Sequence, residues 1–505
     1  MNMLLNQNVT DATLKLMKAA LASPSEELRK AVTTSTGLVP YDLQAPSKNL
    51  YPVATPLRNV IPRVGGGIGT ATHWKSINSI SGSGYDAMGW VPEGQRTARM
   101  TYTAVDKAAS YKTLGEEDSV TFEAINAGKS FEDVAATGVM RILQKMMLKE
   151  EHAILGGNLS VALGTPTTPT LSAAGTGGTL PGAPTTYDVA VVALTFEGWR
   201  SSSVSGGIGT TSTITGADGQ TYTLNGGSSI KSAVATQAIT LGEHLRATVP
   251  AIAGAFAYAW FIGTSGAAKL QAITTINSVD WSLPIANNQT LASVGAGDYS
   301  QNTLAFDGLL YAAIANAGSG NAYIKTMATG TAGTGTPLTT SGRGSVVEID
   351  DALQAMWNNY QVSPSVLYCN AQEIKNITTK VLSNSSGPLL RYNVDGGGAN
   401  PYAIMANGMV EAYFNPFALN GGFKIPIKIH PFCPPGTIAM WAENLPAQYQ
   451  NNNTPNVAEM KIRADYYSLE WPIKTRAREY GVYCEEVLAV YASFAMGLIT
   501  NIGNG

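Results

Sequence analysis

The sequence has few charged residues. Only 13% of its 505 residues are charged, about half of the share near 25% that is usual for soluble proteins. The 32 basic and 35 acidic residues give a net charge of −3, which argues against a strongly basic nucleic-acid binder, because such proteins need excess Lys and Arg. The hydrophobic share of 44% excludes a mostly disordered chain. So little charge leaves much neutral surface, which self-association can cover.

Cysteine and histidine are also scarce. The three cysteines, Cys369, Cys433 and Cys484, are an odd number without CxxC spacing, so we expect inert buried thiols in a reducing compartment. The four histidines lie in separate segments, whereas a metal site needs several donors that converge. We therefore expect no metal and only isolated structural or surface histidines at His73, His152, His244 and His430.

The sequence also lacks a clear secretion signal or membrane span. The first residues, MNMLLNQNVT, have no basic region followed by an apolar core, so we expect no signal peptide. The longest uncharged, mostly apolar stretch runs for 16 residues from Val487 to Ile502 and falls short of the roughly 20 that span a bilayer. We interpret it as buried strand and expect no membrane association.

Motifs for catalysis and cofactor binding are incomplete. Gly128-Lys129-Ser130 resembles the end of a phosphate-binding loop, but that loop needs a glycine where this chain has Glu123. We expect Ser130 to begin a helix instead. No GxSxG elbow is found. We expect no enzyme activity and no cofactor.

Two other groups of residues have plain structural interpretations. The adjacent carboxylates from Glu116 to Asp118 alternate between faces of an extended segment, so we expect a solvated or intersubunit acidic patch. Asp395 to Gly398 favours a loop tip over an anion site. A run of glycines lacks GxGxxG spacing and is expected to act as a flexible hinge: Gly65, Gly66, Gly67 and Gly69.

The N-terminal part predicts an arm followed by a long loop. Two short helices, near Thr10 and after Ser23, precede a proline-punctuated extended chain, so residues 1–64 are expected to lie across other elements. Residues 65–110 predict an extended loop, in which Met100 to Val105 alternates like a strand.

The strongest helix signal lies in residues 130–155, within an expected domain of residues 111–160. Ser130 and Asp133 form a capping box with Asp in place of Glu, and apolar residues recur at helical spacing from Val134 to Ala153. Gly156 and Gly157 are expected to end this helix. A helix of this length indicates a structural spine.

A change in composition marks residues 161–299 as an insertion. Charged residues fall to about 7% between Asn158 and Ser300, against about 16% elsewhere. Short β-rich runs alternate with turn signals such as Glu197-Gly198, and Phe256 to Ile262 alternates with small residues. This pattern predicts a β-sandwich without an intersheet disulfide.

Mixed α/β character resumes after the insertion. Residues 300–435 predict helices after Phe306, after a Ser345 capping box and after Asn370, with a strand from Ser365 to Tyr368. Pro426 favours an edge strand for the alternating isoleucines around it. Residues 436–505 predict long strands after Ala458.

This order of parts resembles the major capsid proteins of tailed bacteriophages. The resembling stretches are Trp90-Val-Pro-Glu-Gly94, Glu150 to Gly157, Ile429 to Thr437 with Ile438 to Trp441, Trp471 to Lys474, Tyr480 to Tyr483, and Glu486 to Leu488. The resemblance implies an α+β Hong Kong 97-like capsid fold with N-arm, extended loop, spine-helix peripheral domain, axial domain and returning C-terminal strands. The insertion resembles immunoglobulin-like or fibronectin type III domains through Tyr187 to Gly198 and Tyr258 to Gly263.

The resemblance implies a structural function. The chain would assemble with itself into hexamers and pentamers of an icosahedral head shell, with the inserted domain outside and packaged double-stranded DNA close by without specific binding. Expected partners are a portal, a possible decoration protein and a separate scaffolding protein, because only some 64 residues precede the loop. The expected location is the virion, after assembly in the host bacterial cytoplasm.

Two alternatives stay open. One is an encapsulin-type nanocompartment shell with the same fold, which the immunoglobulin-like insertion argues against. The other is a secreted glycan-binding adhesin built on the sandwich, which the missing signal peptide and the long helix argue against.

Overall fold

A computed structural model places a large part of the chain. Two compact units are formed, one by Met1–Tyr51 with Phe122–Ala135 and one by Pro52–Thr121 with Ala136–Gly505. The expected arm helices near Thr10 and Ser23, Ser130 and the Asp395 loop lie outside the described residues. The structure describes residues 15, 18, 50–81, 89–97, 99–129, 132–180, 185–315, 322–341, 344–382, 410–418, 421–446, 449 and 456–504.

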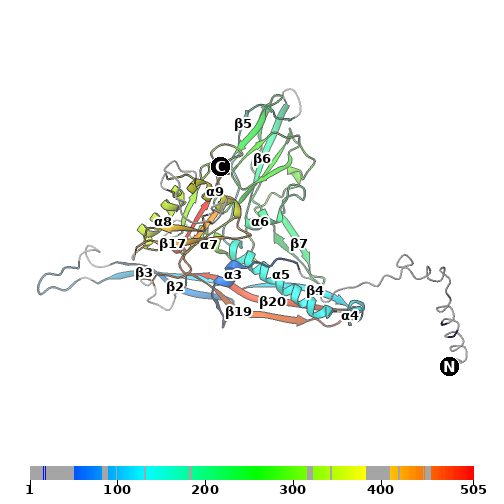
Figure 1. Ribbon diagram of the computed structural model, residues 1–505, viewed down its shortest axis with the longest axis horizontal. Coiled ribbons are helices and arrows are strands. Elements are labelled where there is room, and N and C mark those ends of the chain that lie inside the picture. The colour runs from blue at the N-terminus through cyan, green and yellow to red at the C-terminus, as the bar shows by residue number, and fades with distance from the viewer. Residues whose placement is uncertain are drawn as a thin grey trace, which may run out of the picture. The chain divides into compact units, whose positions relative to one another are not determined.

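The predicted long helix is α5 (Val134–Gly156), which follows the short α4 (Phe122–Gly128) (Figure 1). Its first turn is capped by Asp133, whose Oδ1 accepts a hydrogen bond from the Ala135 N–H at 3.1 Å. Ile142 and Met146 of the predicted apolar stripe are buried and pack against a strand at Val482 and Cys484. One continuous helix is confirmed from Val134 onward, but the predicted start at Ser130 is wrong, because Glu132 and Asp133 are not helical and Asp133 is the capping residue.

α5 packs on a four-stranded sheet with the order β1-β19-β20-β4. The parallel edge strand β1 (Arg63–Val64) follows α3 (Pro56–Val60), and the other three strands are antiparallel. The predicted C-terminal long strands are confirmed as β19 (Ala458–Glu470) and β20 (Ala477–Val490). The last member is β4 (Lys112–Thr121).

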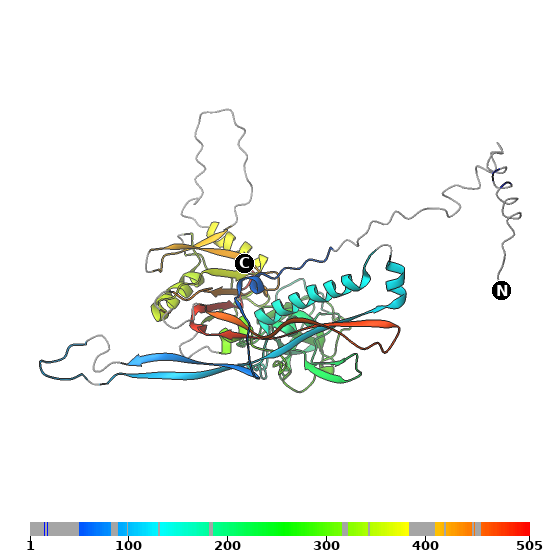
Figure 2. The same cartoon turned by 90° about the horizontal axis from the view of Figure 1, so that it is seen from below.

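The predicted extended loop contains a two-stranded hairpin of β2 (Ala71–Ser81) and β3 (Thr101–Ser110). Within the described residues each strand pairs only with the other. Figures 1 and 2 both show the ribbon continuing past the four-stranded sheet.

A second, six-stranded sheet has the order β14-β21-β18-β15-β17-β16. Helix α7 (Leu309–Ala315) packs on one face, while α8 (Val347–Tyr360) and α9 (Ala371–Leu382) pack on the other. The strands are β14 (Tyr323–Thr326), β15 (Val366–Cys369), β16 (Ala412–Asn415), β17 (Phe423–Ile429), β18 (Ile438–Trp441) and β21 (Met496–Thr500).

Two local predictions in this region are wrong, and a third, the buried strand from Val487 to Ile502, holds only in part. β17 is not an edge strand, because it pairs with β16 through Pro426 and with β15 from Ile427 onward. Ser345 does not cap α8, since its hydroxyl donates to Asp350 at 2.6 Å. The stretch expected to be one strand from Val487 to Ile502 holds the end of β20, the 3-10 turn η4 (Ser493–Ala495) and β21. The cap by Asn370 on α9 is confirmed, because its Oδ1 accepts from the Gln372 N–H at 3.1 Å.

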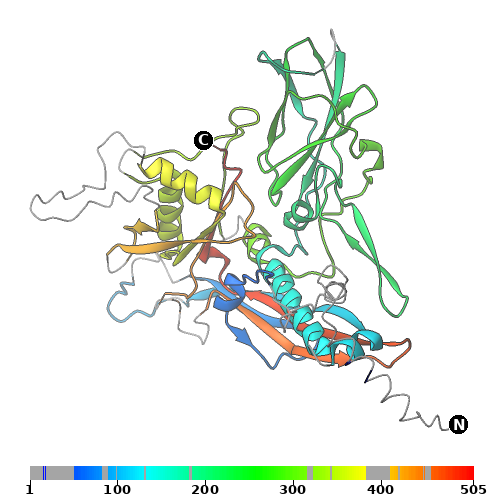
Figure 3. The same ribbon diagram turned by 45° about the vertical axis from the view of Figure 1, so that its right-hand side comes forward.

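The residues expected to be inserted form two facing sheets with an apolar core between them (Figure 3). One sheet has the order β13-β10-β5 and the other β12-β11-β6-β9, and a separate hairpin pairs β7 with β8. The bounds are β5 (Thr170–Ala174), β6 (Thr185–Leu194), β7 (Thr211–Thr215), β8 (Thr221–Asn225), β9 (Ala235–Ile239), β10 (His244–Thr248), β11 (Ala257–Thr264), β12 (Lys269–Thr274) and β13 (Ser278–Trp281).

Two predictions for this segment need correction. The expected turn at Glu197-Gly198 is instead a short helix, α6 (Phe196–Ser201), because the Thr195 hydroxyl accepts from the Gly198 N–H at 3.2 Å. The alternation of large and small residues around Trp260 does not mark one buried and one exposed face, since β11 is buried on both faces by two apolar clusters.

Candidate functional site

The β2–β3 hairpin exposes apolar side chains on one face. Ile80 lies directly opposite Tyr102, and Ile77 lies opposite Ala104, so all four share a face of the ribbon. The exposed fractions are 55% for Ile77, 62% for Ile80 and 65% for Tyr102. A two-stranded hairpin is marginally stable alone in water. Its apolar face is therefore a candidate contact surface.

The segment between the two strands also exposes apolar side chains. Trp90 is 91% exposed, and Val91 and Met100 are also exposed. The Gln95 N–H donates to the Pro92 carbonyl at 3.1 Å, and Gly94 takes a left-handed φ of 75° within this turn. The Trp-Val-Pro-Glu-Gly motif thus forms a turn that presents its tryptophan to the outside.

The hairpin root, residues 65–70, is more restrained than a free hinge would be. The Gly67 N–H donates to the Ile462 carbonyl at 3.0 Å, and a side chain at Gly67 would collide with the Tyr111 ring. Gly66 and Gly69 have left-handed φ values of 85° and 75°, which favour glycine. Gly65 has open space around it. The hinge role of Gly65, Gly66, Gly67 and Gly69 stays a prediction.

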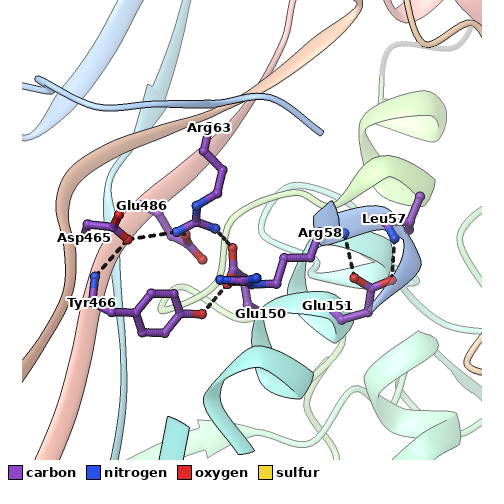
Figure 4. Close-up of polar contacts among 8 residues, drawn as sticks. All are labelled: Leu57, Arg58, Arg63, Glu150, Glu151, Asp465, Tyr466 and Glu486. Atoms are coloured by element: carbon purple, nitrogen blue, oxygen red, sulfur yellow. Dashed lines mark hydrogen bonds and ion pairs between the residues drawn. The ribbon is translucent and has the colours of Figure 1, made fainter. Parts of the chain in front are cut away.

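A buried ionic cluster joins α3 and β1 to the C-terminal end of α5 (Figure 4). We define it as Arg58, Arg63, Glu150, Glu151, Asp465, Tyr466 and Glu486.

Glu150 lies at the centre of the ionic cluster and is fully buried. Arg58 Nε is 2.6 Å from Glu150 Oε2, Arg63 pairs with the other carboxylate oxygen, and the Tyr466 hydroxyl donates to Oε2. Burial alone would lower the pKa of both arginines, but Glu150 raises it above the ordinary value. Two cations thus neutralise one buried carboxylate.

The neighbouring Glu151 binds the backbone of α3. Its Oε1 and Oε2 accept hydrogen bonds from the Leu57 and Arg58 N–H groups at 2.9 and 2.8 Å. His430 Nε2 lies 2.7 Å from Oε1, with both side chains fully buried. Adjacent glutamates on α5 therefore fix the chain just before the hairpin root.

Glu486 is the carboxylate in the cluster with the poorest set of partners. Arg63 Nη2 is 3.5 Å from its Oε2, and both carboxylate oxygens are buried. Burial, followed by repulsion from Glu150, raises the pKa of Glu486 to about 8. This side chain therefore keeps its proton to a higher pH than an ordinary glutamate.

The remaining predicted residues take structural positions. α5 ends at Gly156, but neither Gly156 nor Gly157 has a left-handed φ. Both positions need glycine because neighbouring atoms pack closely against them. A Cβ would collide with the Phe196 ring at Gly156 and with the Phe306 carbonyl at Gly157.

The acidic run of β4 is paired within the chain. Lys149 forms an ion pair with Glu116, and the Tyr483 hydroxyl donates to Glu117. Of the three residues expected to form an acidic patch, Glu116 and Glu117 therefore have partners within the chain. Asp118 is exposed.

Cysteines and histidines lie in ordinary structural surroundings. Cys369, Cys433 and Cys484 are buried and free, and burial raises the pKa of each thiol. His152 packs edge-on against Phe432, and burial followed by nearby Arg200 lowers its pKa to about 4. Among the residues placed by the structure, no three His, Cys, Asp or Glu side chains form a potential metal site. No described helix is long and apolar enough to cross a membrane.

The stretch from Glu150 to Gly157 is one of those that carry the family resemblance, but the sequence alone assigns no role to Glu150 or Glu151. The available signal was a pair of acids beside His152 in an otherwise apolar helix end. Their partners lie 87 to 316 residues away in the chain, so spacing could not identify them.

Comparison with known proteins gives structural likenesses only. No protein-family model matches the chain, and no curated protein matches it in sequence. The capsid of a native GTA particle has a TM-score of 0.41 and 10% identity, covering 94% of this chain and 99% of that chain. The capsid of Myoviridae phage XM1 has 0.39 and 8%, covering 93% and 99%.

A further solved structure is the SrpI encapsulin complex from Synechococcus elongatus, with a TM-score of 0.37 and 8% identity, covering 93% of this chain and 95% of that chain. Because these TM-scores lie below 0.5, the functional proposal rests on the residues of this chain.

Proposed function

We propose that this chain is a shell subunit that assembles with itself into closed particles. The observation that supports it is the hairpin face of Ile77, Ile80 and Tyr102, which no other described residue covers. An exposed apolar face on a two-stranded ribbon is stabilised when another molecule covers it. A second copy of the chain meets this need in every subunit of a closed shell.

The finer proposal is the major capsid protein of a tailed bacteriophage, which encloses double-stranded DNA in the virion. In this proposal residues 1–64 form an arm, residues 65–110 the extended loop, residues 111–160 a peripheral domain, residues 300–435 an axial domain and residues 436–505 the returning strands. Residues 161–299 form an immunoglobulin-like domain on the outer surface. Hexamers and pentamers, a portal, a scaffolding protein and a decoration protein complete the assembly.

The proposal also takes account of charge. With a net charge of −3, the chain has no overall excess of basic residues that would bind packaged DNA tightly, which suits a polymer that must enter and leave. Low charge also limits repulsion between many identical subunits.

The test replaces the apolar hairpin face with charge. Ile80→Asp with Tyr102→Asp should abolish closed particles in electron micrographs, because each buried side chain of this size contributes about 1.5–3 kcal/mol per contact. The subunit should keep its melting temperature, since both positions are exposed. The control is Thr103→Asp, on the opposite face of the same strand, which should assemble normally.

Two results would contradict the proposal: a wild-type chain that stays monomeric at every concentration, with or without a scaffolding protein, or normal particles from the double variant. The content of native particles tests the finer proposal. Nuclease-protected double-stranded DNA supports a phage head, whereas protein cargo without DNA supports a nanocompartment.

A further inference from the structure

The hairpin root follows the β19 strand closely before it enters β2. The Met460 N–H donates to the Pro62 carbonyl at 2.9 Å, just before β1 pairs with β19. Further along, the Gly67 N–H donates to Ile462, and the Tyr111 N–H donates to the Thr70 carbonyl at 3.0 Å. Backbone hydrogen bonds therefore hold the root at its middle and its end, and they also hold the chain just before it.

Strand β19 has an irregularity beside this root. Ile462 pairs with Glu486 and Ala464 pairs with Glu485, so Arg463 is one extra residue in the ladder. Such a bulge bends a strand and redirects a side chain. The carbonyl of Ile462, at the same bulge, accepts the hydrogen bond from Gly67.

The redirected Arg463 side chain contacts both sides of the hairpin root. Its Nη1 donates to the Gly69 carbonyl at 2.7 Å, and its guanidinium carbon lies 5.7 Å from the centre of the Tyr111 ring. Nε is held by Glu485 Oε2 at 2.5 Å. Thus one arginine joins β20 to the segment entering β2 and to the residue following β3.

Apart from these hydrogen bonds, side-chain packing does little to restrain the glycines of the root. Gly65, Gly66 and Gly69 have no atom near the position of a Cβ, so packing does not fix them. A chain with such freedom can take several paths. The contact of Arg463 with the Gly69 carbonyl removes that freedom at the last glycine before β2.

We propose that Arg463 is a positioning residue that fixes the angle at which the β2–β3 hairpin leaves the subunit. It acts through the Gly69 carbonyl and the Tyr111 ring, with Glu485 orienting its guanidinium group. The consequence for assembly rests on the proposed function: the hairpin angle would set the curvature between neighbouring subunits.

Hydrogen exchange tests the local contact without requiring assembly. In the Ile80→Asp, Tyr102→Asp background, Arg463→Ala should speed exchange of the Gly67 and Tyr111 amides at least tenfold. Arg463→Lys should have a smaller effect of the same sign, because it keeps one charge without the forked geometry. The control Arg478→Ala removes an arginine from β20 that lies 3.7 Å from Glu470, away from the root, and should change neither amide.

Protection of the β19–β20 amides reports whether each variant is folded. Unchanged exchange at Gly67 and Tyr111 in folded Arg463→Ala would overturn the proposal. Should that variant unfold, Glu485→Gln decides instead: faster exchange at the two amides supports the positioning role, and unchanged exchange overturns it.

Particle size tests the consequence for assembly. Arg463→Ala in the otherwise wild-type chain should at least double the width of the particle-diameter distribution in electron micrographs, while Arg478→Ala should leave it unchanged. A wild-type width in Arg463→Ala particles would overturn the curvature step and leave the shell proposal intact. Absence of particles from the wild-type chain would instead overturn the shell proposal, and the exchange result would still decide the local role of Arg463.

Discussion

Strands β3 and β6 are each ten residues long but lie in opposite surroundings. β6 has a neighbour on each side, β11 and β9, and its residues from Tyr187 to Leu194 are buried. β3 pairs only with β2 among the residues placed by the structure, and most of its side chains are exposed. β6 is thus stabilised by contacts within the chain, whereas the apolar face of β3 is left exposed.

The largest expected effect comes from matched tryptophans. Trp260 on β11 is fully buried and donates from Nε1 to Thr274 Oγ1 at 2.8 Å, while Trp90 beside the hairpin is 91% exposed. Trp260→Ala should lower the free energy of unfolding by about 3–5 kcal/mol, because it leaves a large cavity. Trp90→Ala should change it by less than about 0.5 kcal/mol.

Urea unfolding of the unassembled Ile80→Asp, Tyr102→Asp background measures both values. Equal losses of unfolding free energy for the two substitutions would contradict the comparison. In the assembling chain, Trp90→Ala should lower particle yield more than Trp260→Ala does at subunit concentrations where folding is complete. Trp90 is exposed in the segment that joins the two strands of the hairpin, whose apolar face we assign to subunit contacts.

Local pattern predicted several elements because the signal lay within a few residues of each. The α5 stripe through Ile142 and Met146 follows from helical spacing, and the Asn370 cap needs only the next turn. Thr195 was an available cap signal for α6, but the glycine after it was interpreted as a turn.

Features set by distant residues could not be predicted this way. Burial of both faces of β11 depends on two separate apolar clusters. The inner position of β17 depends on which strands become its neighbours, so Pro426 alone was misleading. Glu150 meets Arg63 and Tyr466 from segments 87 and 316 residues away. In each case tertiary packing decides the outcome.

The next largest effect concerns the pH dependence of the unfolding free energy. Like the apolar side chains of β6, the charged groups of the ionic cluster have their partners within the chain. Burial raises the pKa of Glu486 to about 8 from an ordinary value of 4.5. Between these values the folded chain keeps a proton that the unfolded chain has released, so stability falls as pH rises through this window. Between pH 5 and pH 9 the contribution of this one group should amount to about 4 kcal/mol.

The measurement compares unfolding free energies at pH 5 and pH 9 in the same unassembled background. Glu486→Gln cannot ionise, so its loss of stability over this range should be smaller than that of the parent chain by about the stated amount. Glu470→Gln, at an exposed position of β19, should leave the parent's pH dependence unchanged. An identical pH dependence in Glu486→Gln would refute the assignment.

The smallest effect comes from matched valines, which test the comparison with almost no change in shape. Val191 on β6 is fully buried, whereas Val105 on β3 is partly exposed. Threonine replaces a methyl group by a hydroxyl of similar size and is also a good strand former. Val191→Thr should cost about 1–3 kcal/mol of unfolding free energy, because the hydroxyl loses water on burial. Val105→Thr should cost less than about 0.5 kcal/mol in the unassembled subunit, and an equal cost at both sites would mean that β3 is already covered within its own chain.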